Sequence, residues 1–401
     1  MARFAPRLLT VPTPEQAARE LQRIGVDSCG IVEMVPKMQT LCIHLPRLEC
    51  RQANVLKQEM LSVGGDAAVA RGTVACSIDK TDCVLIGTVK QLSRLCRKLK
   101  AQPFGLSELS GELDRLLIRI STAPAVWKTS RRSLSLQRPL IMGILNLTPD
   151  SFSDGGRCSD PDRAFEKALQ MEAEGADIID IGGESTRPGA DPVSPEEESG
   201  RILPVIERLA GTLGCAISVD TWKSAVASRA LSAGAEIIND ISGFNFDPQM
   251  AGIAAARGAG VVLMHTRGTP DEMQQDTSYD DLMVEITTGL RASLDRAHGA
   301  GVSDGCIALD PGIGFGKDTA GNLEIIRRLS ELSGFGLPVL IGPSRKSFIG
   351  TVLGREQTDD RLFGTAAVVA LSVSHGASIL RVHDVRAMRD VADMAHAVMH
   401  G

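Results

Sequence analysis

The chain has 401 residues, of which 43% are hydrophobic and 23% charged, and its formal net charge is −6. It is longer than an ordinary domain of about 100–200 residues, and its composition excludes disordered and fibrous proteins. The aromatic content of 3% argues against an aromatic platform for single-stranded nucleic acid. The sequence shows no apolar run of about 18 residues and no signal-peptide pattern, so we expect a cytoplasmic protein without a membrane span.

The charge is distributed unevenly along the chain. Residues 1–138 carry 21 Lys and Arg against 12 Asp and Glu, a net charge of +9, whereas residues 139–401 carry 22 against 37, a net charge of −15. The segment Lys128–Ser133 is rich in Ser, Lys and Arg and is typical of an exposed linker. We therefore expect an N-terminal domain over residues 1–135 and a second domain over 136–401. The scattered basic residues match no nucleic-acid motif and favour a solvated surface, so we expect no nucleic-acid partner.

The first domain shows a mixed pattern of helices and strands. Helical spacing of apolar residues predicts helices at Pro14–Ile24, Arg51–Leu61, Gln91–Leu99 and Ser107–Ile118. Apolar runs predict strands at Cys29–Val35, Met38–Leu45 and Val84–Val89. These elements indicate a small α/β domain, for which a structural or oligomerisation role is favoured over a regulatory or partner-binding one.

The nine cysteines are an odd number without a Cys-X-X-Cys pair. This favours reduced, mostly buried thiols over disulfides or a structural zinc site. Six of them lie in the first domain, where their spacing matches no recognised metal set but leaves a cluster in space open: Cys29, Cys42, Cys50, Cys76, Cys83 and Cys96.

From Pro139 onward, short apolar runs alternate with segments of helical spacing. The runs predict eight strands, at Leu140–Leu145, Asp177–Ile181, Ala216–Val219, Glu236–Ile238, Gly260–Met264, Cys306–Leu309, Pro338–Ile341 and Ser378–Val382. The helical segments include Ala164–Ala173, Glu196–Ala210, Ala225–Ala233, Leu282–Ala297, Asn322–Leu332 and Thr365–Val373. Eight strand–helix units over about 260 residues predict a closed TIM (β/α)8 barrel, with an open doubly wound sheet as the alternative.

Polar residues follow every predicted strand, at the end of the barrel where active sites lie. They are Asn146, Gly182–Arg187, Asp220, Asn239–Asp240, His265, Asp310, Ser344–Ser347 and His383–Asp384. A single aspartate at such a place can be a helix cap or a loop residue. Polar residues after all eight strands indicate a site.

Two groups of polar residues, which lie after the strands or, like Arg381, near the end of one, suggest two kinds of ligand. Carboxylate, amide and ammonium groups at one end of an apolar barrel suit a flat heterocycle with donor and acceptor edges, such as a pterin or purine. This group comprises Asp220, Asn239, Asp310 and Lys346. The second group suits an anion, with a divalent metal that bridges phosphate oxygens to the side-chain amide oxygen of Asn146. It comprises Asn146, Arg187, Arg381 and His383.

Two glycine-containing loops adjoin these residues. The loop Thr148–Gly156 follows the first strand and could close over a substrate, with a plain solvent loop as the alternative. The loop Asp310–Lys317 is rich in glycine, but its lysine spacing does not match a Walker A phosphate loop. Within it, Phe315 could line a ring-binding pocket or pack in the core.

Seven segments carry a family resemblance. They are Ile141–Gly156, Gly182–Gly189, Ser218–Thr221, Ile238–Ile241, Leu309–Lys317, Ser344–Ser347 and Arg381–Val385. In this order they closely resemble the motifs of dihydropteroate synthase, over residues 139–401, whereas residues 1–135 are not covered. The resemblance implies a TIM barrel that uses magnesium to make 7,8-dihydropteroate from (7,8-dihydropterin-6-yl)methyl diphosphate and 4-aminobenzoate. It also implies a homodimer formed through the last helices, where the apolar stretch Ala366–Leu371 could serve the dimer or the barrel.

The resemblance also implies roles for single residues. It places Asp220, Asn239, Asp310 and Lys346 at the pterin, with catalytic roles for Asp220, Asp310 and Lys346. It places Asn146, Arg381 and His383 at the diphosphate, with Asn146 as metal ligand, and Thr186, Arg187, Phe315 and Ser347 near the aminobenzoate. The loops Thr148–Gly156 and Ser185–Gly189 correspond to two mobile lids. The differences from the family at Thr266–Arg267 and at Trp222 within Asp220–Lys223 are expected to have no consequence.

Two other functions remain as alternatives. A pterin-binding methyltransferase would share the aspartate and asparagine contacts, but it does not need the loop Thr148–Gly156 or the segment Ser344–Ser347. A catalytically inactive scaffold would be expected to have lost at least one of the polar positions, and none is lost.

Overall fold

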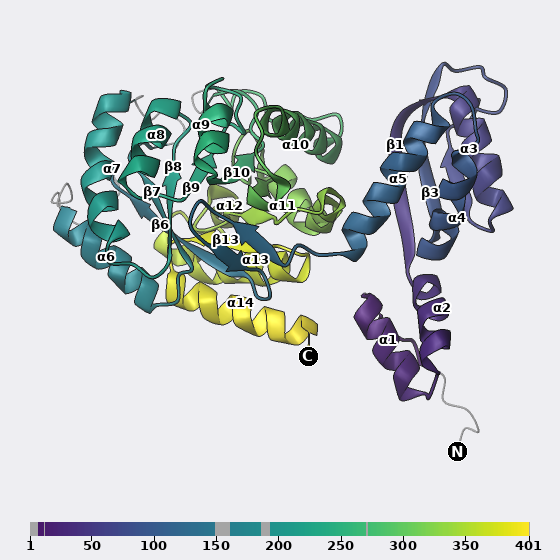
Figure 1. Ribbon diagram of the computed structural model, residues 1–401, viewed down its shortest axis with the longest axis horizontal. Helices are drawn as coiled ribbons and strands as arrows, with labels where there is room; N and C mark the ends of the chain where they lie inside the picture. The colour runs from purple at the N-terminus through teal and green to yellow at the C-terminus, as the bar shows by residue number, and fades with distance from the viewer. Residues whose placement is uncertain (1–6, 12, 149–160, 186–192, 270–271, 401) are drawn as a thin grey trace. The chain divides into compact units, whose positions relative to one another are not determined.

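The computed structural model describes residues 7–11, 13–148, 161–185, 193–269 and 272–400. The chain divides into two compact units, Met1–Thr122 and Ala123–Gly401 (Figure 1). The boundary therefore falls before Ala123 and not near Ser135.

The segment Lys128–Ser133 is not a linker, so that prediction was wrong. It connects the strands β4 (Val126–Lys128) and β5 (Ser133–Ser135), which pair as an antiparallel hairpin within the second unit. The buried carboxylate of Glu236 accepts hydrogen bonds from Thr129 Oγ1 at 2.7 Å and from Arg132 Nε at 2.8 Å. A polar turn that is bound to the barrel has the same composition as a polar linker, so composition could not separate the two.

The first unit is a small α/β domain, as predicted. Its strands are β1 (Thr40–Glu49), β2 (Asp66–Val69) and β3 (Lys80–Thr88), in an antiparallel sheet of order β1-β3-β2. Its helices are α1 (Pro14–Arg23), α2 (Ser28–Met38), α3 (Cys50–Ser62), α4 (Val89–Leu99) and α5 (Leu106–Ser121). The core includes the fully buried side chains of Leu56 from α3, Leu85 from β3 and Leu95 from α4.

Helix α2 corrects the strand predicted at Cys29–Val35. Asp27 caps this helix by accepting a hydrogen bond from the Gly30 amide at 2.9 Å. A short apolar run does not by its period distinguish a strand from a helix, and here the cap decides.

The second unit is a (β/α)8 barrel, which confirms the predicted fold and excludes the open sheet. Eight parallel strands follow the order β11-β10-β9-β8-β7-β6-β13-β12, and a bridge between Leu309 and Val339 joins the two ends. They are β6 (Leu140–Asn146), β7 (Ile178–Gly182), β8 (Ala216–Asp220), β9 (Ile237–Asp240), β10 (Gly260–Met264), β11 (Ile307–Asp310), β12 (Leu340–Ile341) and β13 (Ile379–Val382).

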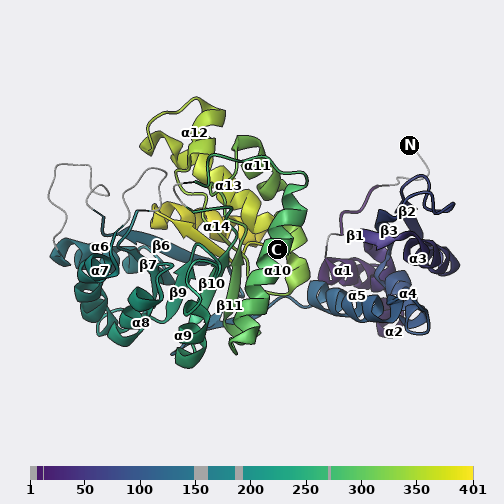
Figure 2. The ribbon, with the colours of Figure 1, turned by 90° about the horizontal axis from the view of Figure 1, so that it is seen from above.

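The helices of the second unit lie around the outside of these strands (Figure 2). They are α6 (Pro161–Ala173), α7 (Pro195–Ala210), α8 (Ser224–Ala233), α9 (Met250–Arg257), α10 (Leu282–Gly299), α11 (Thr319–Arg328), α12 (Ser347–Leu353), α13 (Leu362–Ser374) and α14 (Val385–His400). No helix in the described part of the chain is long and apolar enough to span a membrane.

Trp127 of the hairpin closes the amino-terminal end of the barrel. Its side chain is fully buried, and its indole Nε1 donates a hydrogen bond to the Cys306 carbonyl at 2.9 Å. It packs on an apolar layer that the first residues of the strands contribute: Leu140, Met142, Ile178, Ala216, Ile237, Val262, Ala308, Leu340 and Ile379. Because this end is filled, the inward-facing polar side chains gather towards the carboxyl end.

Candidate active site at the carboxyl end of the barrel

A pocket opens among the carboxyl ends of the strands. It is lined by Asp220, Asn239, Ile241, Met264, Asp310, Ile313, Phe315, Gly342, Lys346 and Arg381. The four residues predicted to contact a heterocycle are all among them, together with Phe315 and Arg381. Apolar walls with a few convergent polar groups are typical of a small-molecule site.

The strand register aligns several of these residues. Asn146 of β6 is paired with Gly182 of β7, Gly182 with Asp220 of β8, and Asp220 with Asn239 of β9. Gly182 leaves room between its neighbours, because a Cβ there would lie 3.4 Å from Asn146 Oδ1 and 3.5 Å from Asp220 Cβ. The amide of Asn146 and the carboxylate of Asp220 therefore face the same space.

Arg381 joins two carboxylates inside the barrel. Its Nε donates to Asp180 Oδ2 at 2.6 Å, and its Nη2 donates to Asp220 Oδ2 at 2.5 Å. Asp180 Oδ2 also accepts a bond from Asn239 Nδ2 at 3.0 Å. Asp180 is fully buried in the middle of β7, so one residue orients both Arg381 and Asn239.

The sequence analysis missed Asp180 because it lay inside a segment read as an apolar strand. Alternation along β7 could have identified it, since Asp180 shares the inward face with Ile178 of the apolar layer. Its Oδ1 and the neighbouring Ser218 Oγ are buried and find no hydrogen-bond partner among the described residues.

The carboxyl group of Asp220 has a strongly perturbed pKa. Burial raises this pKa to about 7, the Arg381 guanidinium opposes the rise, and the negative charge of Asp180 adds to it. The two carboxylates in turn raise the pKa of Arg381 above its ordinary value, although burial acts against them. Arg381 is therefore a permanent cation, and Asp220 can change its charge near neutral pH.

Lys346 and Asp310 form the opposite side of the pocket. Lys346 Nζ donates to the Ile313 carbonyl at 2.6 Å and lies 4.2 Å from the centre of the Phe315 ring. Burial lowers the pKa of Lys346 to about 8. Burial raises the pKa of Asp310, whose Oδ1 accepts a bond from the Gly312 amide at 2.7 Å. Phe315 is thus a pocket residue with a cation on its ring.

The glycine-rich loop after β11 is a tight backbone turn that holds Phe315. At Gly312, where φ is +73°, a Cβ would lie 1.9 Å from the His265 carbonyl oxygen. The buried Lys317 Nζ donates to the Phe315 carbonyl at 2.8 Å and to the His265 carbonyl at 3.3 Å. Burial lowers the pKa of Lys317 to about 7 and that of His265 to about 3, so His265 is neutral here. These contacts fix the backbone of the loop and the position of Lys317 beside His265.

The remaining predicted residues lie around this pocket or outside the described residues. Asn146 ends β6, His383 follows β13 with its Nδ1 3.0 Å from Ser344 Oγ, and the exposed Ser347 begins α12. Thr186 and Arg187, and most of the loops Thr148–Gly156 and Ser185–Gly189, lie outside the described residues.

Asn146 fits a role in holding magnesium. Its side chain makes no hydrogen bond with the described residues, and it offers a hard oxygen beside Asp220. Magnesium commonly uses one or two protein oxygens together with water and substrate phosphates. Among the described residues, no group of three or more His, Cys, Asp or Glu side chains could hold a metal by itself, and this includes the six N-terminal cysteines.

Comparisons with known proteins identify the family of the barrel. The family model of pterin binding enzymes matches residues 142–383. A dihydropteroate synthase of Bacillus subtilis is 48% identical over 264 residues, which cover 66% of this chain and 90% of that protein. A solved structure of Xanthomonas albilineans dihydropteroate synthase with 4-aminobenzoic acid has a TM-score of 0.65 and 42% identity, and the match covers 70% of this chain and 100% of that one.

A further relative extends over the first unit. A Haloferax volcanii protein named "Probable bifunctional folylpolyglutamate synthase/dihydropteroate synthase" is 40% identical over 385 residues, which are 93% of this chain. This chain covers 45% of that relative, so it spans less than half of its length. The chain belongs to the pterin binding enzyme family, and its barrel to the dihydropteroate synthases within that family.

Proposed function

We propose that the chain condenses (7,8-dihydropterin-6-yl)methyl diphosphate with 4-aminobenzoate to give 7,8-dihydropteroate and diphosphate, with magnesium. The observation that carries this proposal is a set of polar groups that line one pocket. Asn239 and Asp310 are buried there, and Asp220 and Lys346 are half-buried. Polar groups shielded from water need partners, and the edge of a pterin ring offers donors to the carboxylates and acceptors to the amide and the ammonium.

The chemical step needs charge stabilisation at two places. When the C–O bond to diphosphate breaks before the amine arrives, positive charge develops on the pterin methylene carbon. The carboxylates of Asp220 and Asp310 offset this charge. Arg381 and His383 hold the departing diphosphate. Arg381 donates to Asp180 and Asp220 through Nε and Nη2, and its Nη1 makes no hydrogen bond with the described residues, so Nη1 can donate to the diphosphate. A magnesium ion at Asn146 would neutralise negative charge on the diphosphate and so favour its departure.

The aminobenzoate nitrogen then forms the C–N bond and loses a proton to solvent. An aniline nitrogen is a weak base that already carries a free electron pair, so it needs placement more than a general base. In this proposal Phe315, Ser347, Thr186 and Arg187 provide that placement. Phe315 has support from its position in the pocket wall.

A homodimer and a cytoplasmic location belong to the same proposal. Large apolar side chains are exposed on α13, where Phe363 is 85% and Leu371 50% exposed, and on α14 at Met394 and Val398. A second copy of the chain would cover such a surface. Light scattering should then give twice the chain mass, and Leu371→Glu should give the single-chain mass. The unpaired thiols of eight cysteines among the described residues support a reducing compartment.

Product formation tests the proposal. Mass spectrometry should detect dihydropteroate only when the pterin diphosphate, 4-aminobenzoate and magnesium are all present, and a chelator should abolish it until magnesium is restored. Asp220→Asn should lower turnover by at least about 100-fold if Asp220 stabilises the developing cation. Turnover of this variant within a few fold of the wild type would contradict that role.

A further inference from the structure

Side chains that follow β10 hold the loop that carries Phe315. Tyr279 Oη donates a hydrogen bond to the Gly316 carbonyl at 2.7 Å, and Gln274 Nε2 donates to the Gly314 carbonyl at 3.1 Å. Gly314 and Gly316 are the chain neighbours of Phe315. An aromatic ring of the pocket wall is therefore flanked on each side by a carbonyl that is bonded to another loop.

Three successive carbonyls of this loop are bonded to side chains. The third is the carbonyl of Phe315 itself, which accepts a bond from the buried Lys317 Nζ at 2.8 Å. On both sides of Phe315 the backbone is glycine in the left-handed region, with φ of +79° at Gly314 and +64° at Gly316. Glycine has more conformational freedom than any other residue in an unconstrained chain. The bonds to the carbonyls therefore restrict where the Phe315 ring can lie.

Tyr279 is itself held in one orientation. The Arg267 guanidinium lies 3.9 Å from the centre of the Tyr279 ring, and its Nη2 donates to Glu285 Oε2 of α10 at 2.5 Å. A guanidinium over the face of an aromatic ring is attracted to it. The Tyr279 ring is half-buried and packs against the barrel core. Because the ring cannot turn freely, its hydroxyl group stays directed at the Gly316 carbonyl.

The residue between these bonds belongs to the pocket. The Phe315 ring lines the pocket and lies 4.2 Å from the Lys346 ammonium. Its neighbour Gly316 is buried, and a Cβ there would lie 3.2 Å from the Met273 carbonyl oxygen. Because the side towards Met273 is filled, loss of the Tyr279 bond lets Gly316 move away from that side, and Phe315 moves with it. A bond that served stability alone would not move a pocket residue.

We propose that Tyr279 is a positioning residue that, through the Gly316 carbonyl, holds the Phe315 ring in the pocket wall and thereby sets the affinity for 4-aminobenzoate. The inference rests on the proposed function, in which Phe315 helps to place the aminobenzoate. It also gives a role to Arg267, which orients Tyr279 and lies where the sequence analysis expected differences from the family to have no consequence.

The test compares Tyr279→Phe with Thr287→Val. Tyr279→Phe removes the hydroxyl group and keeps the ring, whereas Thr287 of α10 bonds through its hydroxyl to the Met283 carbonyl of its own helix at 2.8 Å. Tyr279→Phe should raise the KM for 4-aminobenzoate at least about five-fold, because small misplacements of a substrate-positioning group are costly. Its Kd for the pterin diphosphate, measured by calorimetry, should stay within about two-fold, because Asp220 and Asn239 lie on β8 and β9. Thr287→Val should change neither.

A double-mutant cycle asks whether Tyr279 acts through Phe315. In a Phe315→Ala background the ring is already absent, so Tyr279→Phe should change the KM for 4-aminobenzoate by less than about two-fold. Hydrogen exchange supplies a readout that does not depend on turnover. The Phe315 amide, which donates to the Gly312 carbonyl at 3.1 Å, should exchange faster in Tyr279→Phe and unchanged in Thr287→Val.

Two results would overturn the inference: an unchanged KM for 4-aminobenzoate in Tyr279→Phe, or the full rise in KM also in the Phe315→Ala background. If Tyr279→Phe does not fold, Arg267→Met decides in the same way, because it removes the guanidinium that orients the Tyr279 ring. Absence of product from the wild type would instead overturn the proposed function. An unchanged KM in Phe315→Ala would overturn the placement of the aminobenzoate by Phe315, and the inference with it.

Discussion

Replacing Asp180 by asparagine should move the acid limb of the pH–rate profile to lower pH. Asp180 and Asp220 share the guanidinium of Arg381, and the charge of Asp180 contributes to the raised pKa of Asp220, which is about 7. Because Asp220 must be ionised to offset positive charge on the pterin, wild-type kcat/KM for the pterin diphosphate should fall as the pH drops below about 7. Asp180→Asn removes a negative charge close to Asp220. Asp220 is then the one negative partner of the Arg381 guanidinium within hydrogen-bond distance among the described residues, and both changes lower the pKa of Asp220.

The structure also sets the size of the effect. Loss of one like charge from a buried cluster shifts a pKa by about one unit or more, which corresponds to about 1.4 kcal/mol per unit. The asparagine oxygen can accept both bonds that Asp180 Oδ2 now accepts, while its amide nitrogen takes the place of the unpartnered Oδ1. Asp180→Asn should therefore cost about 1–3 kcal/mol of stability, whereas Asp180→Ala should cost about 3–5 kcal/mol because Arg381 and Asn239 lose their acceptor.

The assay is kcat/KM against pH for the wild type and Asp180→Asn at saturating magnesium, with urea unfolding of both proteins and of Asp180→Ala. The diphosphate substrate titrates identically with both enzymes, so the difference between the profiles reports the protein. A limb that stays in place or moves to higher pH in Asp180→Asn would refute this account of Asp220.

Three further predictions concern Trp127 at the amino-terminal end of the barrel, Gly312 in the loop after β11, and Lys346 in the pocket. Trp127→Ala should lower the free energy of unfolding by about 3–5 kcal/mol, measured by urea titration, because it leaves a cavity at the amino-terminal end of the barrel. Gly312→Ala should lower kcat/KM at least about ten-fold, since the new methyl group collides with the His265 carbonyl, whereas Gly299→Ala, which meets nothing within 4 Å, should behave like the wild type. Activity should also fall as the pH rises above about 8, where Lys346 loses its proton, and Lys346→Arg, which stays charged, should abolish this basic limb whatever its maximal rate.

The fold could be predicted because its periodic signal is strong and repeated. All eight barrel strands lie within one or two residues of their predicted positions, and Asp220, Asn239 and Asp310 followed from the rule that barrel sites lie at carboxyl strand ends. The rule does not say which of two adjacent polar residues at a strand end points into the barrel. Asn239 faces the pocket, whereas both carboxyl oxygens of Asp240 are used by the amides of Ser242 and Phe244.

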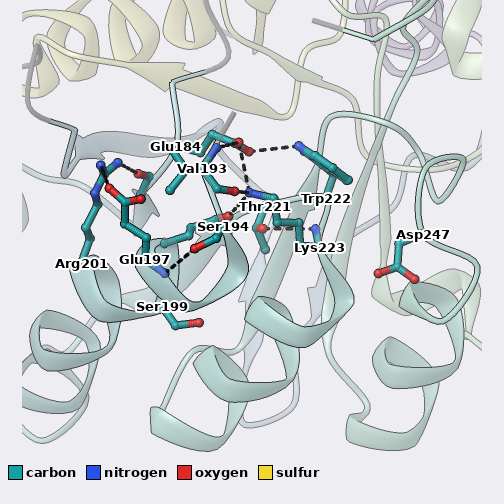
Figure 3. Close-up of polar contacts among 12 residues, drawn as sticks. Glu184, Val193, Ser194, Glu197, Ser199, Arg201, Thr221, Trp222, Lys223 and Asp247 are labelled. Carbon is teal, nitrogen blue, oxygen red and sulfur yellow. Dashed lines mark hydrogen bonds and ion pairs between the residues drawn. The ribbon is translucent and has the colours of Figure 1, made fainter. Parts of the chain in front are cut away.

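The errors have a common physical origin in contacts between distant parts of the chain. Asp180 lies within a strand, and its role depends on its hydrogen bond with Arg381, about half the chain away in sequence. The buried Lys223 was passed over because its partners, at Glu184, Val193 and Glu198, come from another strand–helix unit (Figure 3). Local composition does not report such partners, so the hairpin around Lys128–Ser133 was likewise misread.

Paired turnover measurements on Asp310→Asn and Asp240→Asn test the central claim most directly. Both aspartates are buried at the ends of barrel strands, but only Asp310 lines the pocket. The account predicts that Asp310→Asn lowers dihydropteroate formation at least about 100-fold while remaining folded, because it loses a contact to the reacting pterin. Asp240→Asn should lose stability but keep turnover within about ten-fold of the wild type at a temperature where it is folded, because its bonds are to loop amides. Equal turnover of the two variants, or wild-type activity in Asp310→Asn, would contradict the placement of the pterin in this pocket.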